Sequence, residues 1–365
     1  MITFSHLYFI AYYLTAIIAS AVISAYSVKK IIFITKNRKI YDTPDDTRKI
    51  HGAEIPSLGG IGIFIGYIIT TAFFWPVGHA FMPYILASSV ILFFTGIYDD
   101  LMNMRPSKKL LAQLIASLVT VYFADIRIES FYGLFGVGDI PAWAGIMLTT
   151  IGCTFFINAF NFIDGIDGLA CTLAILYSGL LGCLFLYVGH NSLPAIAFSL
   201  VGATAGLLWY NKAPAKIYMG DTGSMLLGFT IFIFSVLFVR MDARESYVHT
   251  HAIIHSTQSA FMIALSILFL PIYDAVRVFI LRLSRGRSPL RADRTHLHYY
   301  LLDAGFSHSQ STAIILLGNI AVIGIAFLLQ DVNPVISLLT MFLFAGLMLF
   351  AIYRLRKTKL ASPVI

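Results

Sequence analysis

A short polar stretch, NAFNFIDGIDG at positions 158–168, stands between two strongly apolar runs. Residues three apart on a helix are neighbours, so Asn161 and Asp164, and then Asp164 and Asp167, would present adjacent oxygen atoms. The two glycines in this stretch would let a ligand approach the backbone closely. A capped helix end needs only one Asp and one Gly. The surplus of carboxylates and amides, Asn158 included, therefore indicates a binding or catalytic site.

Two further acidic motifs have the same character. Asp99 and Asp100 are consecutive in GIYDDLMNMRPSKK, and Asp221 lies in the turn MGDTGS. Adjacent carboxylates repel each other and usually have a raised pKa or a bound cation. Neutralisation by Lys108 and Lys109 is the structural alternative. Oxygen ligands suit Mg²⁺, which takes one or two carboxylates together with water and substrate phosphates, and we expect Asp221 to be a third carboxylate at that metal.

Two basic loops provide the opposite charge. Arg48, Lys49 and His51 lie in RKIHGAEIPS, and the second loop reads RGRSPLRADRTHLHYY at 285–300. Arginine binds phosphate oxygens in pairs, so these loops predict contact with a phosphate or a nucleotide. The candidates in the second loop are Arg285, Arg287, Arg291, Arg294, His296 and His298. A zinc site at the two histidines is a weaker alternative, because it would need a third ligand.

The elements that must position these residues are membrane helices. Of the 365 residues, 58% are hydrophobic and only 12% are charged, which is far from the usual balance of a soluble domain. A bilayer core of about 30 Å requires about 20 apolar residues per helix. The expected spans are 6–28, 57–76, 81–98, 108–126, 141–160, 168–188, 192–210, 223–240, 258–281, 311–330 and 334–353. We therefore expect an all-α polytopic integral membrane protein with eleven transmembrane helices and a single domain over residues 1–365.

The Lys and Arg residues predict an orientation. Of the 25 Lys and Arg, 21 fall in one set of alternate loops or at the start of the fourth span, so these loops are expected to be cytoplasmic. All the polar motifs described above lie on that side. The N-terminus is then outside and the C-terminus cytoplasmic, and the first span is an uncleaved helix because basic residues follow it. The net charge of +7 borders a membrane, so no nucleic acid is expected as a partner.

The remaining polar residues and the cysteines receive mainly structural interpretations. Asp274 and Arg277 lie three apart in the ninth span and are expected to pair, with a structural and a functional role equally open. The histidines of the loop 241–257 are expected to be solvated. Three residues fall within spans and are assigned to packing rather than to disulfides: Cys153, Cys171 and Cys183.

Clustered carboxylates, a divalent cation and a collar of Arg and His at the cytoplasmic edge of a membrane suit a soluble diphosphate that meets a lipid-borne acceptor. Phosphoryl transfer depends mainly on positioning and charge neutralisation, with a carboxylate to accept the proton of the attacking group. These residues predict a metal-dependent membrane phosphotransferase and identify no sugar or nucleotide. A proton-coupled transporter is the alternative, but its binding groups would lie near the bilayer midplane, often within inverted repeats, and no repeat is visible.

The motifs RKIHGAEIPSLGG, YDD, NAFNFIDGIDGLA, MGDTGS and SPLRADRTHLHYYLLDAGFS, in this order, resemble the polyprenyl-phosphate N-acetylhexosamine-1-phosphate transferase family. The likeness covers nearly the whole chain and is strongest to the bacterial branch that begins O-antigen and enterobacterial common antigen synthesis. It implies transfer of GlcNAc-1-phosphate from UDP-GlcNAc to undecaprenyl phosphate at the cytoplasmic face of the bacterial inner membrane. Mg²⁺ would be the cofactor, with Mn²⁺ as an alternative, and a homodimer stays open.

The resemblance also implies roles for individual residues. Four aspartates match catalytic positions of the family: Asp99, Asp100, Asp164 and Asp167. Two residues match positions that hold Mg²⁺: Asn161 and Asp221. The candidates for substrate binding are Arg48, Lys49, His51, Asn158, Arg287, Arg294, His296 and His298.

One departure from the family concerns the sugar. Relatives usually carry HxHH, whereas this chain has His296-Leu297-His298-Tyr299. The missing third imidazole leaves another UDP-N-acetylhexosamine open as the substrate, although Tyr299 retains a hydrogen-bond donor. The relative that transfers phospho-N-acetylmuramoyl-pentapeptide carries three consecutive histidines, so HLHY argues against that substrate.

Overall fold

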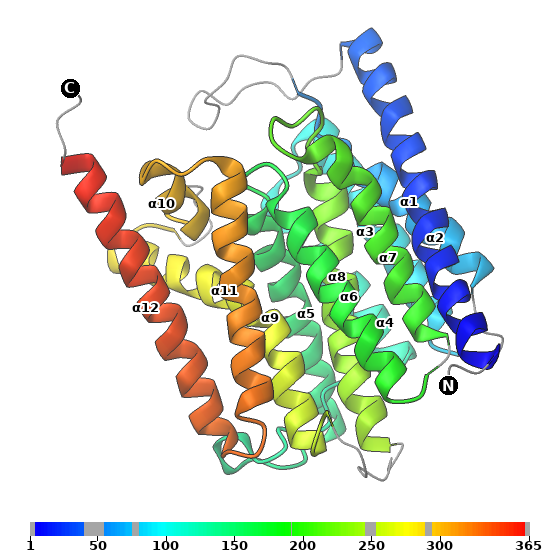
Figure 1. Cartoon of the computed structure of the whole chain (residues 1–365), viewed down its shortest axis with the longest axis vertical. Coiled ribbons are helices and arrows are strands. Elements are labelled where there is room, and N and C mark those ends of the chain that lie inside the picture. The colour runs from blue at the N-terminus through cyan, green and yellow to red at the C-terminus, as the bar shows by residue number, and fades with distance from the viewer. Residues whose placement is uncertain are drawn as a thin grey trace.

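A computed structural model of the chain is a bundle of long helices (Figure 1). It describes residues 4–39, 55–74, 80–190, 192–244, 253–288 and 294–361. Within these ranges there is no strand, only an isolated antiparallel bridge between Ser130 and Asp139. The expected all-α class is confirmed.

The helices follow the apolar runs of the sequence. They are α1 (Phe4–Arg38), α2 (Gly60–Phe73), α3 (Met82–Met102), α4 (Pro106–Phe123), η1 (Leu134–Gly136), α5 (Ala142–Ile163), α6 (Leu169–Tyr187), α7 (Leu193–Asn211), α8 (Gly220–Arg244), α9 (Thr257–Ser284), α10 (Leu297–Asp303), α11 (His308–Leu328) and α12 (Pro334–Ala361). Nine of those in the described part are long and apolar enough to cross a membrane. Helices α2 and α4 correspond to the other two expected spans. The polytopic membrane architecture is confirmed, while the number of crossings and their orientation stay predictions.

Helix α8 is the centre of the bundle. Its most apolar stretch is completely buried, and it packs against α2, α3, α5, α6 and α9. A Cβ atom at Gly96 of α3 would lie only 2.4 Å from the Cα atom of Thr222, so a glycine is required for this approach. The first turn of α8 is therefore held directly against α3.

The outer helices expose apolar side chains. Leu14 on α1 is 51% exposed, Phe94 on α3 65% and Leu347 on α12 59%. Apolar surface of this extent is unusual for a soluble monomer and is expected where lipid covers the protein. Cys183 is also exposed, so its assignment to internal packing is wrong, whereas the other two cysteines are buried.

The beginning of α1 and the end of α12 lie at opposite ends of the bundle (Figure 1). Helix α9 contains Pro271 and bends near its middle, so that its C-terminal half turns towards α12 and α10 (Figure 1). Proline removes a backbone hydrogen bond and bends a helix in this way. The bend brings the second half of α9 beneath the loop that carries the two histidines.

Candidate active site

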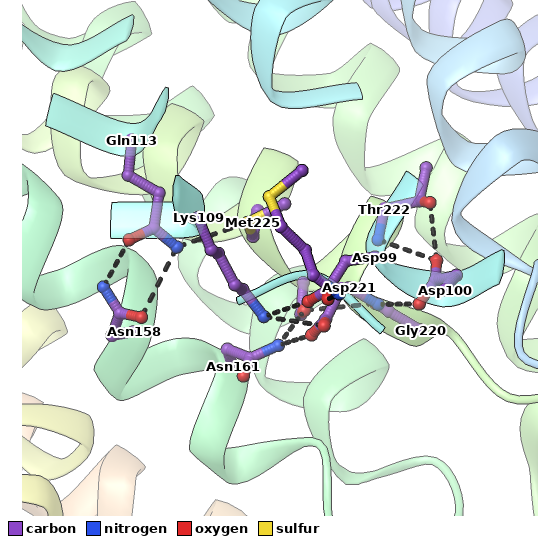
Figure 2. A network of polar contacts seen from close by, with 12 residues as sticks. Asp99, Asp100, Lys109, Gln113, Asn158, Asn161, Gly220, Asp221, Thr222 and Met225 are labelled. Carbon is purple, nitrogen blue, oxygen red and sulfur yellow. Dashed lines mark hydrogen bonds and ion pairs between the residues drawn. The ribbon is translucent and has the colours of Figure 1, made fainter. Parts of the chain in front are cut away.

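An acidic cluster lies where α3 ends and where α4 and α8 begin (Figure 2). The Nζ atom of Lys109 is 2.8 Å from Oδ2 of Asp99 and 2.6 Å from Oδ2 of Asp221. The backbone N–H of Met104 donates to the other oxygen of Asp99 at 2.6 Å. One ammonium group therefore holds two carboxylates that come from distant parts of the sequence.

Asn161, on the last turn of α5, joins this cluster (Figure 2). Its amide group donates to Oδ1 of Asp221 and to Oγ of Ser224, the second at 2.7 Å. Asp221 consequently has an ammonium on one oxygen and an amide on the other. The two residues expected to hold the metal are in direct contact.

Asp100 faces a different direction from Asp99. Its Oδ1 atom accepts a hydrogen bond from the backbone N–H of Asp221 at 2.7 Å. Its Oδ2 atom accepts from the backbone N–H of Thr222 at 3.0 Å and from the Thr222 hydroxyl at 2.6 Å. The carboxylate thus satisfies the free N–H groups at the start of α8, where the helix dipole favours a negative charge. The expected repelling pair is not formed, and catalysis by Asp100 stays a prediction.

Asp164 lies beside the start of α8. Because α5 ends at Ile163, the helical spacing expected to align Asp164 with Asp167 does not continue. The backbone N–H of Gly220 donates to the Asp164 carboxylate. Burial raises the pKa of Asp164 to about 7, and the neighbouring charge of Asp221 contributes to the rise. Asp164 therefore shares the electrostatic environment of the acidic cluster.

Asp167 fixes the loop that precedes α8. Its Oδ2 atom accepts from the backbone N–H of Ala215 at 3.0 Å and lies 3.4 Å from Nδ1 of His308. The Oδ1 atom of Asn211, at the end of α7, accepts a hydrogen bond from the backbone N–H of Gly168 at 3.1 Å and supports the same turn. These contacts position the loop, and a direct catalytic role of Asp167 stays a prediction.

Asn158 lies one turn before Asn161 and joins α5 to α4 (Figure 2). Its amide group donates to Oε1 of Gln113 at 2.6 Å, and Nε2 of Gln113 lies 3.3 Å from the sulfur of Met225. This pairing orders the helices behind the cluster. The expected contact of Asn158 with a substrate stays a prediction.

The basic candidates are only partly visible. Arg48, Lys49 and His51 lie outside the described residues. Arg287 is exposed. Arg294 is half-exposed, with its Nη2 atom 3.3 Å from Oδ1 of Asp303 and its guanidinium 4.9 Å from the ring centre of Tyr299.

His296 and His298 are both buried, and their rings are parallel with centroids 5.8 Å apart. The His296 ring also packs on Phe162 of α5 at 5.5 Å. A Cβ atom at Gly165 would lie 2.2 Å from Nε2 of His298, so glycine is needed where this ring meets the polar motif. Burial lowers the pKa of His298 to about 3, which makes this imidazole neutral at pH 7.

The donor set at the cluster fits a hard divalent cation. No group of three His, Cys, Asp or Glu side chains with metal-binding geometry occurs in the described part of the chain, at the histidine pair or elsewhere. Mg²⁺ does not need such a group, because it keeps several waters and takes substrate phosphates as ligands. Asp99 and Asp221 already converge on one cation, the Lys109 ammonium, and Asn161 brings an amide to the same carboxylate.

Three residues near the site had no assigned role in the sequence predictions: Gln113, Asn211 and His308. Gln113 and Asn211 are fully or almost fully buried. An uncharged polar side chain inside an apolar span is expensive to bury, and that cost is the signal that singles them out. Lys109, considered only as a neutralising residue, lies at the centre of the cluster.

Known proteins resemble this chain in the region that contains the acidic cluster. The model of glycosyl transferase family 4 matches residues 82–239, which include every acidic residue of the cluster. The undecaprenyl-phosphate alpha-N-acetylglucosaminyl 1-phosphate transferase of Escherichia coli strain K12 is 29% identical over 320 residues, which cover 86% of this chain and 83% of the relative.

Two further relatives extend the comparison beyond this bacterium. The probable undecaprenyl-phosphate N-acetylglucosaminyl 1-phosphate transferase of Bacillus subtilis is 29% identical over 333 residues, or 90% of this chain and 88% of the relative. The decaprenyl-phosphate N-acetylglucosaminephosphotransferase of Mycobacterium tuberculosis strain H37Rv is 30% identical over 292 residues, or 74% and 71%. The chain thus belongs to the polyprenyl-phosphate N-acetylhexosamine-1-phosphate transferases of glycosyl transferase family 4, as its motifs predicted.

Proposed function

We propose that this protein transfers GlcNAc-1-phosphate from UDP-GlcNAc to undecaprenyl phosphate, with undecaprenyl-diphospho-GlcNAc and UMP as products. The observation that carries the proposal is the convergence of Asp99 and Asp221, from separate helices, on one cation, the Lys109 ammonium, with the amide of Asn161 bound to Asp221. Relatives named for this transfer align with more than four fifths of the chain. The cluster lies at helix ends, which favours an enzyme over a transporter with a midplane site.

The reaction would proceed by direct attack. An oxygen of the lipid phosphate forms a bond to the β-phosphorus of UDP-GlcNAc, the bond from that phosphorus to the bridging oxygen breaks, and UMP leaves. A carboxylate accepts any proton that the lipid phosphate still carries. Asp99 suits this task better than Asp100, because its Oδ2 atom faces the Lys109 ammonium that also binds Asp221, whereas Asp100 binds the first residues of α8.

We propose Mg²⁺ as the cofactor, with Mn²⁺ as the alternative. Asp221 and Asn161 would hold the cation, and Asp99 lies close enough to share it. When bound, a divalent cation neutralises the charge of the diphosphate and polarises its oxygens. The protein's own contribution is to fix these side chains on three helices, so that little reorganisation accompanies the reaction.

The site is proposed to face the cytoplasm from the inner membrane of a bacterium. The excess of Lys and Arg on the side of the acidic cluster supports this orientation. The product would then be the first lipid-linked sugar of an O-antigen or a related cell-surface polysaccharide.

The purified chain in detergent, mixed with radiolabelled UDP-GlcNAc, undecaprenyl phosphate and Mg²⁺, should release UMP and form a labelled lipid. A panel of UDP-N-acetylhexosamines and UDP-N-acetylmuramoyl-pentapeptide establishes the sugar preference. Absence of UMP release with every donor would overturn the proposed reaction. Accumulation of a phospho-enzyme without the lipid acceptor would replace direct attack by a two-step route.

A further inference from the structure

Asp274 on α9 forms the centre of a second buried network, separate from the acidic cluster. It lies three residues after Pro271 and is 7% exposed. Its Oδ1 atom accepts from Nη2 of Arg277 at 2.6 Å and from the backbone N–H of Leu297 at 3.2 Å. Its Oδ2 atom lies 2.8 Å from Nδ1 of His296, which is itself 5% exposed. The expected pairing of Asp274 with Arg277 is confirmed, but the pair also holds the histidine loop.

Arg277 holds the backbone on the other side of the same histidine. Its Nη2 atom donates to the carbonyl oxygen of Thr295 at 2.6 Å. Its guanidinium lies 5.3 Å from the ring centre of Tyr300, and Arg356 of α12 approaches that ring at 4.4 Å. The loop is therefore fixed before and after His296, which leaves its ring little freedom to turn.

The network also determines which nitrogen of His296 carries the hydrogen. A carboxylate only accepts hydrogen bonds, so Nδ1 of His296 must donate to Asp274. In the neutral ring, Nε2 is then an acceptor. The ring packs on Phe162, one residue after Asn161, so the His296 side chain lies beside the polar motif at the end of α5.

We propose that Asp274 is a positioning residue for the sugar nucleotide: it holds His296 with the hydrogen on Nδ1, so that Nε2 accepts a hydrogen bond from a hydroxyl or amide N–H of the substrate. Arg277 fixes the backbone that carries this ring. The choice of ligand rests on the proposed function, whereas the protonated nitrogen of His296 does not.

Asp274→Asn is a sharp test because its effect on the tautomer follows from the geometry. Arg277 donates to Oδ1 from both Nε, at 3.2 Å, and Nη2, at 2.6 Å, so the amide oxygen of the variant is held on that side. The amide nitrogen then faces Nδ1 of His296 and forces the hydrogen onto Nε2. The acceptor offered to the substrate becomes a donor.

Nitrogen-15 NMR of the full chain labelled at histidine, with His296 assigned through His296→Gln, reads the tautomer directly. The wild-type protein should show Nδ1–H at His296, and Asp274→Asn should show Nε2–H. Addition of UDP-GlcNAc should shift the Nε2 signal of the wild-type protein. A wild-type His296 with Nε2–H overturns the inference even if every variant is unstable and whether or not UDP-GlcNAc is a substrate.

Kinetics then separate positioning from a general structural effect. Asp274→Asn should raise KM for UDP-GlcNAc by about ten- to a hundredfold, the cost of mispairing a buried hydrogen-bonding group, with less than about a threefold change in kcat. Asp331→Asn is the matched control, because Asp331 makes the same contact with His255, at 2.7 Å, between α9 and the α11–α12 turn. The control should leave KM and the His296 tautomer unchanged. An inverted tautomer with an unchanged KM would overturn the role in substrate binding.

Discussion

The ionic clusters at the two ends of α8 differ in their balance of acidic and basic groups. Beyond α4, Asp125 and Glu129 meet Arg127 and Arg240, so two acids face two bases, with the Nη2 atom of Arg240 at 2.5 Å from Oδ2 of Asp125. At the start of α8, about 28 Å away along the helix, the described residues bring four aspartates together with one ammonium, that of Lys109, which binds Asp99 and Asp221. A balanced cluster is complete without a ligand, whereas an acidic surplus favours a further cation. Charge balance therefore distinguishes a structural cluster from a candidate active site.

Asp221→Asn should have the largest effect. The variant removes the carboxylate shared by Lys109 and Asn161, and with it the main ligand proposed for the metal. Turnover should fall about a thousandfold, since a catalytic cation contributes several kcal/mol to transition-state stabilisation. Initial rates of UMP release and Mn²⁺ binding followed by electron paramagnetic resonance are the measurements. Retention of wild-type activity by a correctly inserted protein would remove Asp221 from the site.

Lys109→Met should make the stability of the folded protein depend on a metal ion bound at the acidic cluster. Two largely buried carboxylates lose their cation, which should lower the free energy of unfolding of metal-free protein by about 3 kcal/mol. Added Mg²⁺ should restore more stability to this variant than to the wild type, as measured by denaturant unfolding in micelles. Lys108→Met, one residue earlier and exposed, is the control and should change neither quantity. Equal responses to Mg²⁺ in all three proteins would contradict the comparison.

Asp100→Asn should have a smaller effect, and on stability more than on metal binding. The amide retains one acceptor for the start of α8 and loses the other, which corresponds to a damaged helix cap of about 1–2 kcal/mol. Thr222→Val removes only the hydroxyl that donates at 2.6 Å and should lose about half as much. Thr222→Ser keeps the hydroxyl and serves as the control. Loss of Mn²⁺ binding in Asp100→Asn at unchanged stability would make Asp100 a ligand instead of a cap.

Asp125→Asn should have the smallest effect. The side chain of Asp125 is 51% exposed, and surface ion pairs contribute about 0.5 kcal/mol. Activity should stay at the wild-type level, and the free energy of unfolding should change by less than the scatter between preparations. A large loss of UMP release here would break the distinction drawn between the two ends of α8.

The fold was largely predictable because each crossing needs a long apolar run, and such runs dominate this sequence. Two features were harder to predict from the sequence: the end of α1 and the short helix α10. Helix α1 continues to Arg38, ten residues past the expected end at 28, because polar residues end a membrane span without ending a helix. The short α10 is fixed by contacts of Asp274 and Arg277 with the loop before it, which no local pattern reveals.

The sequence predicted which residues form the candidate site, but it did not predict which groups each of them contacts. Asp99 and Asp100 are adjacent in the sequence, but neighbours on a helix point about 100° apart, so one faces Lys109 and the other the start of α8. Asp100 belongs to the C-terminal end of α3, where the helix dipole disfavours an acid. Its carboxylate, however, binds the N-terminal end of α8, where the dipole favours one. Only the packing of α3 against α8 decides which of these environments the carboxylate occupies.

Main-chain hydrogen bonds join the segment before α2 to the segment before α8. Tyr218 N–H donates to the Pro56 carbonyl at 2.8 Å, Gly59 N–H donates to the Tyr218 carbonyl at 2.9 Å, and Gly60 N–H donates to the Met219 carbonyl at 2.8 Å. No exchange of side chains can delete these bonds, except for a proline at a donating position. The alignment of Asp221 with the start of α2 is therefore protected against most mutations.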